Sequence, residues 1–244
     1  MLTFDDFKKL ATDNSLKTHQ KVGFDDCHRE NSEDNIFIDI CDKLSLFNND
    51  VKGGGKNILD IGCGCSKPVL MMIDFAKKMG HHLYLVDSKE MLDNLPDEKF
   101  ITKIPCEFPK CEAILELKNS MDCIVIYSVL HHVVEHGNYI KFLDTAVELL
   151  KENGRLLLAD IPNITKKKRF LSSSEGIKFH QEWSKSKDVP QVVWNELENG
   201  VIDDSLVFSI LKRYRNMGCE TYLLEQKDGL PMNKTREDIL IRRN

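Results

Sequence analysis

The chain has 244 residues, of which 41% are hydrophobic and 30% are charged, and its formal net charge is −5. This length accommodates one large α/β domain or one domain with an appended lid, and the acidic balance argues against a dedicated nucleic-acid-binding protein. Residues 1–14 lack the apolar stretch of a secretory signal, and no apolar run approaches the roughly 18 residues that span a bilayer. We expect a cytoplasmic protein that binds neither nucleic acid nor membranes.

Eight cysteines are spread along the chain, an even number that would suit disulfides in a secreted protein. Because the sequence shows no secretory signal, free thiols in a reducing compartment are the better interpretation. Cys63 and Cys65 stand close together, but the ligand spacing of a tetrahedral zinc site is absent. We expect no metal site.

The first fifty residues have helical patterns. Residues 2–11 read as a short amphipathic helix, and residues 35–47 carry apolar side chains at helical spacing. The sequence Lys52-Gly53-Gly54-Gly55-Lys56 then marks a clear break. We therefore expect a helical cap over residues 1–50, followed by a core domain over residues 51–244.

After the break, short apolar strands alternate with helices. Such alternation predicts a parallel sheet covered on both faces, because right-handed crossovers place helices on each side. The expected strands are 57–61, 82–86, 100–104, 123–126, 155–159, 220–225 and 238–242, and the expected helices are 68–79, 89–95, 111–117, 139–151 and 203–217. About ten residues separate the last two strands, too few for a crossover, so these strands should form an antiparallel hairpin. We predict a doubly wound, Rossmann-like α/β fold with a seven-stranded, mainly parallel sheet.

A candidate ligand site lies where the first two strands end. In doubly wound folds, ligands bind beyond the carboxyl ends of the strands. The first strand leads into Asp60-Ile61-Gly62-Cys63-Gly64-Cys65-Ser66, where glycines allow a sharp turn and a close approach by a ligand. The second strand ends at Asp87, whose carboxylate can accept hydrogen bonds from two ribose hydroxyls. The competing interpretations are a helix N-cap for Asp87 and an ordinary tight turn for the glycines.

These residues resemble the class I methyltransferases that use S-adenosylmethionine (SAM), over roughly residues 55–160. The resemblance implies that Gly62, Cys63 and Gly64 line the methionine part of SAM, and that Asp60 holds its amino group. It places Asp87 on the ribose, and the rest of the expected cofactor site comprises Ser88, Met91, Ser128 and the loop 104–107. Ser66 stands where the family motif has its third glycine. A nicotinamide dehydrogenase would require glycine at position 67, where this chain has Lys67.

Candidate catalytic side chains follow the fourth and fifth strands. Methyl transfer from a sulfonium is an in-line displacement, so holding the acceptor in line accounts for most of the catalysis. A general base is needed when the acceptor is protonated at neutral pH. His131 and His132 follow the fourth strand and Asp160 ends the fifth, and each is a candidate for such a role. Alternatively, the histidines pack or cap a helix, and Asp160 anchors the following loop.

Residues 161–202 form a polar, partly basic segment that we interpret as a lid on the acceptor side. Its run from Lys166 to Arg169 can attract an anionic acceptor, although a charge run is often only a solvated loop. Aromatic side chains in the segment can exclude water from the site; they are Phe170, Phe179 and Trp183. The expected acceptor-binding residues are Asn163, Lys168, Arg169 and His180, with His180 also a catalytic candidate. His19 and Lys21, near the N-terminus, could close over the cofactor, but we expect them to be exposed on the surface.

This segment and residues 230–241 resemble small methyltransferases of bacterial surface-polysaccharide biosynthesis, some of them linked to O-methyl phosphoramidate decoration of capsules. The resemblance implies an O-methyltransferase that acts on a small anionic precursor. The alternatives are an N- or C-methyltransferase of another metabolite, and a non-catalytic SAM-binding module. Residues 127–130 replace the Asn/Asp-Pro-Pro-aromatic motif of enzymes that methylate amino groups of nucleic acids.

Overall fold

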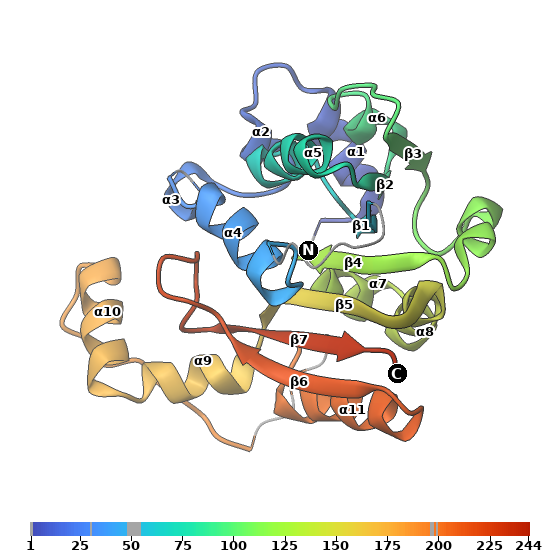
Figure 1. Cartoon of the computed structure of the whole chain (residues 1–244). Helices are drawn as coiled ribbons and strands as arrows, with labels where there is room; N and C mark the ends of the chain where they lie inside the picture. Colours follow the sequence, from blue (N-terminus) through green and yellow to red (C-terminus); the bar gives the residue numbers. More distant parts are fainter. Residues whose placement is uncertain (1, 30, 48–54, 196–197, 199) are drawn as a thin grey trace.

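The computed structural model describes residues 2–29, 31–47, 55–195, 198 and 200–244. Seven strands form one sheet in the order β3-β2-β1-β4-β5-β7-β6 (Figure 1). Their bounds are β1 Asn57–Ile61, β2 His82–Asp87, β3 Ile101–Pro105, β4 Met121–Tyr127, β5 Leu150–Pro162, β6 Glu220–Glu225 and β7 Arg236–Arg242. Strands β1 to β5 pair in parallel, whereas β7 runs antiparallel to both β5 and β6. The predicted doubly wound sheet and its antiparallel hairpin are confirmed.

Helices cover both faces of this sheet. Their bounds are α1 Phe4–Thr12, α2 Thr18–Lys21, α3 Asp26–Arg29, α4 Glu33–Lys43, α5 Lys67–Met79, α6 Lys89–Leu92, η1 Glu112–Leu117, α7 Leu130–His136, α8 Tyr139–Leu149, α9 Ile164–Leu171, α10 Ser174–Ser184 and α11 Asp204–Asn216. Helices α4, α5 and α6 contribute to one buried apolar cluster, and η1, α8 and α11 contribute to the other. Within the described residues, no helix is long and apolar enough to cross a bilayer.

The alternation of side chains along the strands explains these two cores. In β4, Ile124 and Ile126 belong to one cluster, while Cys123 and Val125 belong to the other. Successive side chains of a strand point to opposite faces, so a strand covered on both sides must be apolar throughout. This continuous apolar character is the pattern from which the parallel sheet was predicted.

The helix boundaries follow local sequence signals. Helix α5 begins with Pro68 in its first turn and ends at Gly80, which adopts a left-handed conformation with φ of 69°. The Asp203 side chain caps α11 by accepting a hydrogen bond of 2.9 Å from the Leu206 amide. In both cases a residue type that favours helix ends stands at the boundary.

Three segments differ from the expectation. Helix α8 ends at Leu149, and Gly154 lies inside β5, where an added Cβ would approach the Met121 carbonyl oxygen to 2.9 Å. Residues 112–117 form a 3-10 helix, and the segment 161–202 contains α9 and α10, which extend beside the sheet (Figure 1). The Gly-rich break and the expected domain boundary at residue 50 lie largely outside the described residues.

Candidate functional site

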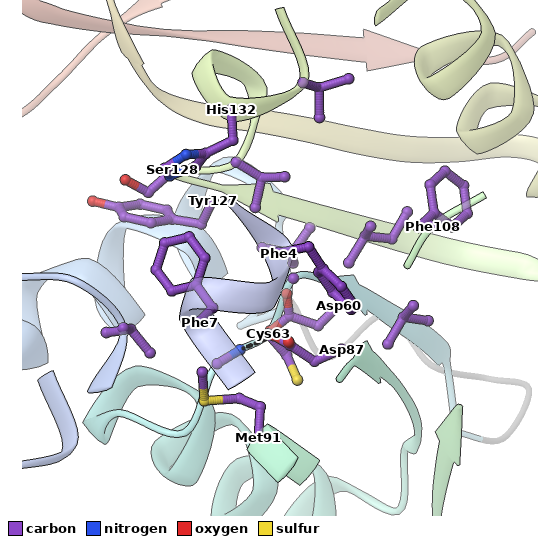
Figure 2. A pocket seen from close by; sticks show the side chains of 18 of the residues that line it. Phe4, Phe7, Asp60, Cys63, Asp87, Met91, Phe108, Tyr127, Ser128 and His132 are labelled. Carbon is purple, nitrogen blue, oxygen red and sulfur yellow. Dashed lines mark hydrogen bonds between the residues drawn. The ribbon is translucent and has the colours of Figure 1, made fainter. Parts of the chain in front are cut away.

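A cavity of about 770 Å³ lies beyond the carboxyl ends of the central strands. Its walls include the loop after β1, the end of β2, the turn from β4 into α7, and the aromatic rings of α1 (Figure 2). The strand order reverses between β1 and β4, and this reversal leaves room for a ligand between their loops. The cavity is therefore at the place where the sequence analysis expects a cofactor.

The glycine loop after β1 takes a conformation that favours glycine. Gly62 and Gly64 have φ values of 72° and 62°, in the left-handed region. A Cβ on Gly62 would lie 2.6 Å from Val129 Cγ2, and one on Gly64 would lie 2.6 Å from Val22 Cγ1. Ser66, at the third position of the family motif, is the N-cap of α5 with φ of −84°, an extended backbone that any residue adopts. Serine is compatible with the loop for this reason.

Asp87 holds this loop in place. Its Oδ2 accepts a hydrogen bond of 2.9 Å from the Gly64 amide, and its Oδ1 accepts one of 2.7 Å from the Ser88 amide. The N-cap of α6 is Ser88, whose hydroxyl accepts from the Met91 amide at 3.1 Å. The N-cap interpretation of Asp87 is thus wrong, and the Asp87 carboxylate lines the cavity (Figure 2).

Two carboxylates share the cofactor half of the cavity. Burial, followed by the nearby Asp87 charge, raises the pKa of Asp60 to about 7. Burial raises the pKa of Asp87 to about 6, although the amides of Gly64 and Ser88 favour its charged form. Among the described residues, the side-chain carboxylate of Asp60 has no hydrogen-bond donor, although its backbone is paired within the sheet. A ligand that donates from hydroxyl and ammonium groups would relieve both carboxylates, and SAM carries both kinds of donor.

Most of the other expected cofactor residues line the cavity, but Ser88 does not. Cys63, Met91 and Ser128 line the cavity, as do Cys106 and Glu107 of the expected adenine loop. Ser88 is outside the lining because its hydroxyl is committed to capping α6. Apart from Ser88 and the loop residues Ile104 and Pro105, the structure brings the predicted cofactor-binding residues together around the cavity.

The opposite half of the cavity has the predicted histidines and an unexpected hydrogen bond. Ser128 lines the cavity, and its hydroxyl donates to Asp160 Oδ2 at 2.6 Å, while Asp160 Oδ1 has no hydrogen-bond partner among the described residues. His131 is half-buried, and burial, His132 and Arg236 lower its pKa to about 3. His132 donates from Nδ1 to the Leu2 carbonyl at 3.1 Å. Asp160 therefore stands behind Ser128, whereas both histidines line the cavity.

The residues expected from the lid have partners outside the cavity. The Asn163 side chain caps α9 through the amides of Thr165 and Lys166 and donates to Asp204 and Glu237. Lys168 pairs with Glu198 at 2.8 Å, and Arg169 pairs with Asp204 at 2.5 Å. None of these three side chains lines the cavity within the described part of the chain, and His180 on α10 does not line it either.

The lid aromatics likewise do not close this cavity. Phe170 and Phe179 contact each other with ring centroids 5.6 Å apart, and Phe179 and Trp183 are exposed on α10. The rings that line the cavity are Phe4, Phe7, Phe24, Phe108, Tyr127 and Phe142. The N-terminal arm, residues 2–29, supplies three of these six rings. The rings of this arm, and not those of the lid, are therefore the ones that line the cavity.

The expectation that His19 and Lys21 are exposed is wrong. His19 Nε2 lies 2.6 Å from Asp26 Oδ1, and Lys21 Nζ donates to the Ala11 carbonyl and to Asn94 Oδ1, at 3.1 and 2.9 Å. Both side chains are buried. The Lys21–Asn94 hydrogen bond joins the N-terminal arm to the turn after α6, and the next residue, Val22, lies against Gly64.

Sequence reasoning did not identify two arginines that line the cavity, Arg29 of α3 and Arg236 of β7. The Arg29 guanidinium lies over the Phe24 ring at 3.9 Å and near the Tyr127 ring at 5.5 Å. No motif surrounds either residue, and 206 positions separate them in the sequence. Only the folding of the N-terminal arm and the closing hairpin onto the cavity reveals them.

In a comparison with protein families, the family described as "Methyltransferase domain" matches residues 33–191, which is more than half of the chain. The chain belongs to this family. The match spans the glycine loop, Asp87 and the turn after β4, and with the doubly wound sheet it confirms the prediction of a class I SAM-dependent methyltransferase. A comparison with curated protein sequences found no match.

Solved methyltransferase structures have the same fold. The plantazolicin methyltransferase BpumL, in complex with a triazolic desmethylPZN analog and SAH, matches with a TM-score of 0.61 and 13% identity over 99% of this chain and 98% of that one. The CurJ carbon methyltransferase matches with a TM-score of 0.58 and 12% identity over 97% of this chain. This methyltransferase spans 64% of the CurJ chain. At such identities the likeness shows the fold.

Proposed function

We propose that this methyltransferase transfers the methyl group of SAM to an oxygen of a small acceptor, and that both molecules occupy the cavity between the N-terminal arm and the sheet. The observation that carries this proposal is the pair of carboxylates beside the glycine loop, a half-buried Asp60 and a buried Asp87, in a cavity that continues to Ser128 and His131. One half of the cavity suits the cofactor, and the other half has groups suited to an acceptor.

In the cofactor half, the chain's own groups fit SAM. Asp87 retains free lone pairs that can accept from the ribose hydroxyls, and Asp60 can accept from the methionine ammonium. Arg29 places a positive charge in the same cavity and is suited to bind the methionine carboxylate of SAM. It lies on the same arm as Val22, which packs against Gly64. When bound, SAM supplies a methyl group activated by its sulfonium.

In the acceptor half, the chain's groups position an oxygen and take up its proton. The Ser128 hydroxyl donates to Asp160, so its lone pairs face an acceptor hydroxyl, and the proton of that hydroxyl can pass through Ser128 to Asp160. His131 is neutral at physiological pH because its pKa is lowered to about 3, so it lines the acceptor half as an uncharged ring. The aromatic rings of the arm exclude water from the reacting groups.

The sequence resemblance supports a finer proposal: a cytoplasmic O-methyltransferase whose acceptor is an anionic precursor in bacterial capsule or surface-polysaccharide biosynthesis, such as a phosphate, a phosphoramidate or a nucleotide-linked compound. The alternative of a C-methyltransferase is favoured by the likeness to the CurJ carbon methyltransferase. The Ser128–Asp160 pair favours oxygen, because an alcohol needs a nearby proton acceptor at neutral pH.

Two measurements test this function. Calorimetry of the purified chain with SAH should show binding at one site, and its absence would refute the cofactor assignment. Transfer of labelled methyl from SAM should then be screened against phosphorylated sugars, nucleotides and phosphoramidates, with their uncharged parent compounds as controls. Binding of SAH without transfer to any compound class would favour the non-catalytic module.

A further inference from the structure

Arg236 is an arginine of the closing hairpin whose side chain lines the methyltransferase cavity. It begins β7, directly opposite Pro162 at the end of β5 in the antiparallel register, and Pro162 lines the cavity as well. The cofactor residues come from β1, β2 and their loops, whereas β7 lies two strands beyond β4 in the sheet order. Arg236 therefore belongs to the acceptor half.

The donors of Arg236 are only loosely engaged within the protein. Its Nη1 donates to the Asp160 carbonyl at 3.3 Å, its Nη2 contacts Met232 Sδ at 3.5 Å, and its Nε lies 3.9 Å from Asp160 Oδ1. The last distance is too long for a hydrogen bond, and Asp160 Oδ1 has no such partner in the described residues. A guanidinium has five N–H donors, so most of its capacity is available to a ligand.

The acceptor half brings this guanidinium close to the groups proposed to position the reacting oxygen. Asp160 links Arg236 to Ser128, and the positive charge of Arg236 contributes to the lowered pKa of His131. A ligand held by Arg236 would therefore lie near both Ser128 and His131. An arginine at such a position can bind a carboxylate or phosphate through two parallel hydrogen bonds.

We propose, resting on the proposed function, that Arg236 is the specificity-determining residue of this methyltransferase and binds an oxyanion of the acceptor, a phosphate or carboxylate group. In this proposal Arg236 binds the anion, and the basic run of α9, Lys166–Arg169, does not. Lys166 donates to the Arg236 carbonyl at 2.5 Å, while Lys168 and Arg169 pair with Glu198 and Asp204. The acceptor then has an oxyanion at Arg236 and its reacting oxygen at Ser128.

The experiment uses inorganic phosphate as the probe and the full chain saturated with SAH. Thermal unfolding is followed as phosphate replaces chloride at constant ionic strength and pH. The wild-type chain should gain a saturable increase in Tm, Arg236→Gln should lose it, and Arg236→Lys should retain part of it. The matched control is Lys167→Gln, which removes one exposed charge of α9 outside the cavity and should keep the full increase. Acetate in place of phosphate distinguishes a carboxylate site from a phosphate site.

Each outcome decides the assignment. A wild-type Tm that does not respond to either anion, a response that survives in Arg236→Gln, or a loss that is equal in Lys167→Gln would overturn it. SAH affinity, measured by calorimetry, should be unchanged in Arg236→Gln and weakened in Arg29→Gln. A loss of SAH affinity in Arg236→Gln would assign Arg236 to the cofactor instead.

Failure of the wild-type chain to bind SAH would refute the proposed function. In that case the change in Tm with phosphate, measured without SAH, would still test whether Arg236 binds an anion.

Discussion

The Ser128 hydroxyl donates a hydrogen bond of 2.6 Å to Asp160 Oδ2 and so connects the ends of two neighbouring parallel strands. Both residues have left-handed backbones, with φ of 60° and 57°. Asp160 is buried, and its amide donates to Asp238 Oδ1 at 2.8 Å. The pair therefore presents one oriented proton acceptor to the cavity through Ser128.

We expect Asp160→Asn to lower kcat on a hydroxyl acceptor by about 100-fold or more, the usual contribution of a general base. Asparagine tolerates the left-handed backbone, so the fold should persist. Ser128→Gly also keeps this backbone and should lower kcat, because it removes the hydroxyl that transmits the proton. Initial rates with the acceptor found by label transfer measure the effect, and calorimetry with SAH provides the control. Unchanged turnover in both variants would exclude the pair from proton transfer.

Asp87→Ala should weaken SAH binding by roughly 10-fold or more, since each charge-assisted hydrogen bond contributes about 1.5–3 kcal/mol. The same change also releases the Gly64 amide, so the glycine loop should become less ordered. Asp93→Ala is the matched control because Asp93 is an exposed carboxylate nearby, paired with Lys89 at 2.6 Å. Calorimetry compares the two dissociation constants, and equal values would remove Asp87 from the ribose site.

Much of this site could be predicted from the sequence because its residues follow strand ends within a short stretch. Asp60, Gly62, Gly64 and Asp87 are placed by the alternation of strands and glycine turns, and their positions depend little on the rest of the chain. The same reasoning located the closing hairpin, since ten intervening residues cannot form a crossover.

The acceptor half depended on contacts that span the whole sequence. The run Lys166–Arg169 appears cationic in the sequence, but the acidic groups that pair with Lys168 and Arg169 lie 30 and 35 positions later. Arg236 appears unremarkable in the sequence, and only the register of β7 on β5 brings it to the cavity. Charge composition of a segment does not show which charges are already paired, so the lid was given a role that the arm and the hairpin are better placed to fill.

Acidification should stabilise the SAH-free chain while it weakens SAH binding. The pKa values of Asp60 and Asp87 in the folded chain are about 7 and about 6, above the ordinary value of 3.8. The folded state therefore binds more protons than the unfolded state between about pH 4 and 7, and the contribution of these groups to stability is lost as the pH rises through that range. Their charged forms are the ones that accept from SAH, so its affinity should fall from pH 8 to pH 5.

Asp60→Asn tests the origin of this pH dependence. The variant removes a half-buried charge, so at pH 8 its Tm without SAH should exceed that of the wild-type chain, and its SAH affinity should be lower. Thermal scans at pH 5 and pH 8 measure both effects, and the difference in Tm between the two pH values should shrink in the variant. The prediction fails if Asp60→Asn and the wild-type chain show the same dependence on pH.

The glycine loop offers a comparison between backbone strain and crowding. Gly62 and Gly80 have similar φ values of 72° and 69°, so alanine at either position incurs the left-handed penalty of about 1–2 kcal/mol. A Cβ at Gly80 meets no atom within 4 Å, whereas a Cβ at Gly62 lies 2.6 Å from Val129 Cγ2. We expect Gly80→Ala to lower Tm by a few degrees with unchanged SAH affinity. Gly62→Ala should lower Tm further and reduce SAH affinity, because the loop must move away from Val129 into the cavity. Calorimetry with SAH compares the two variants. Equal effects of the two variants on SAH binding would show that the loop does not contact the cofactor.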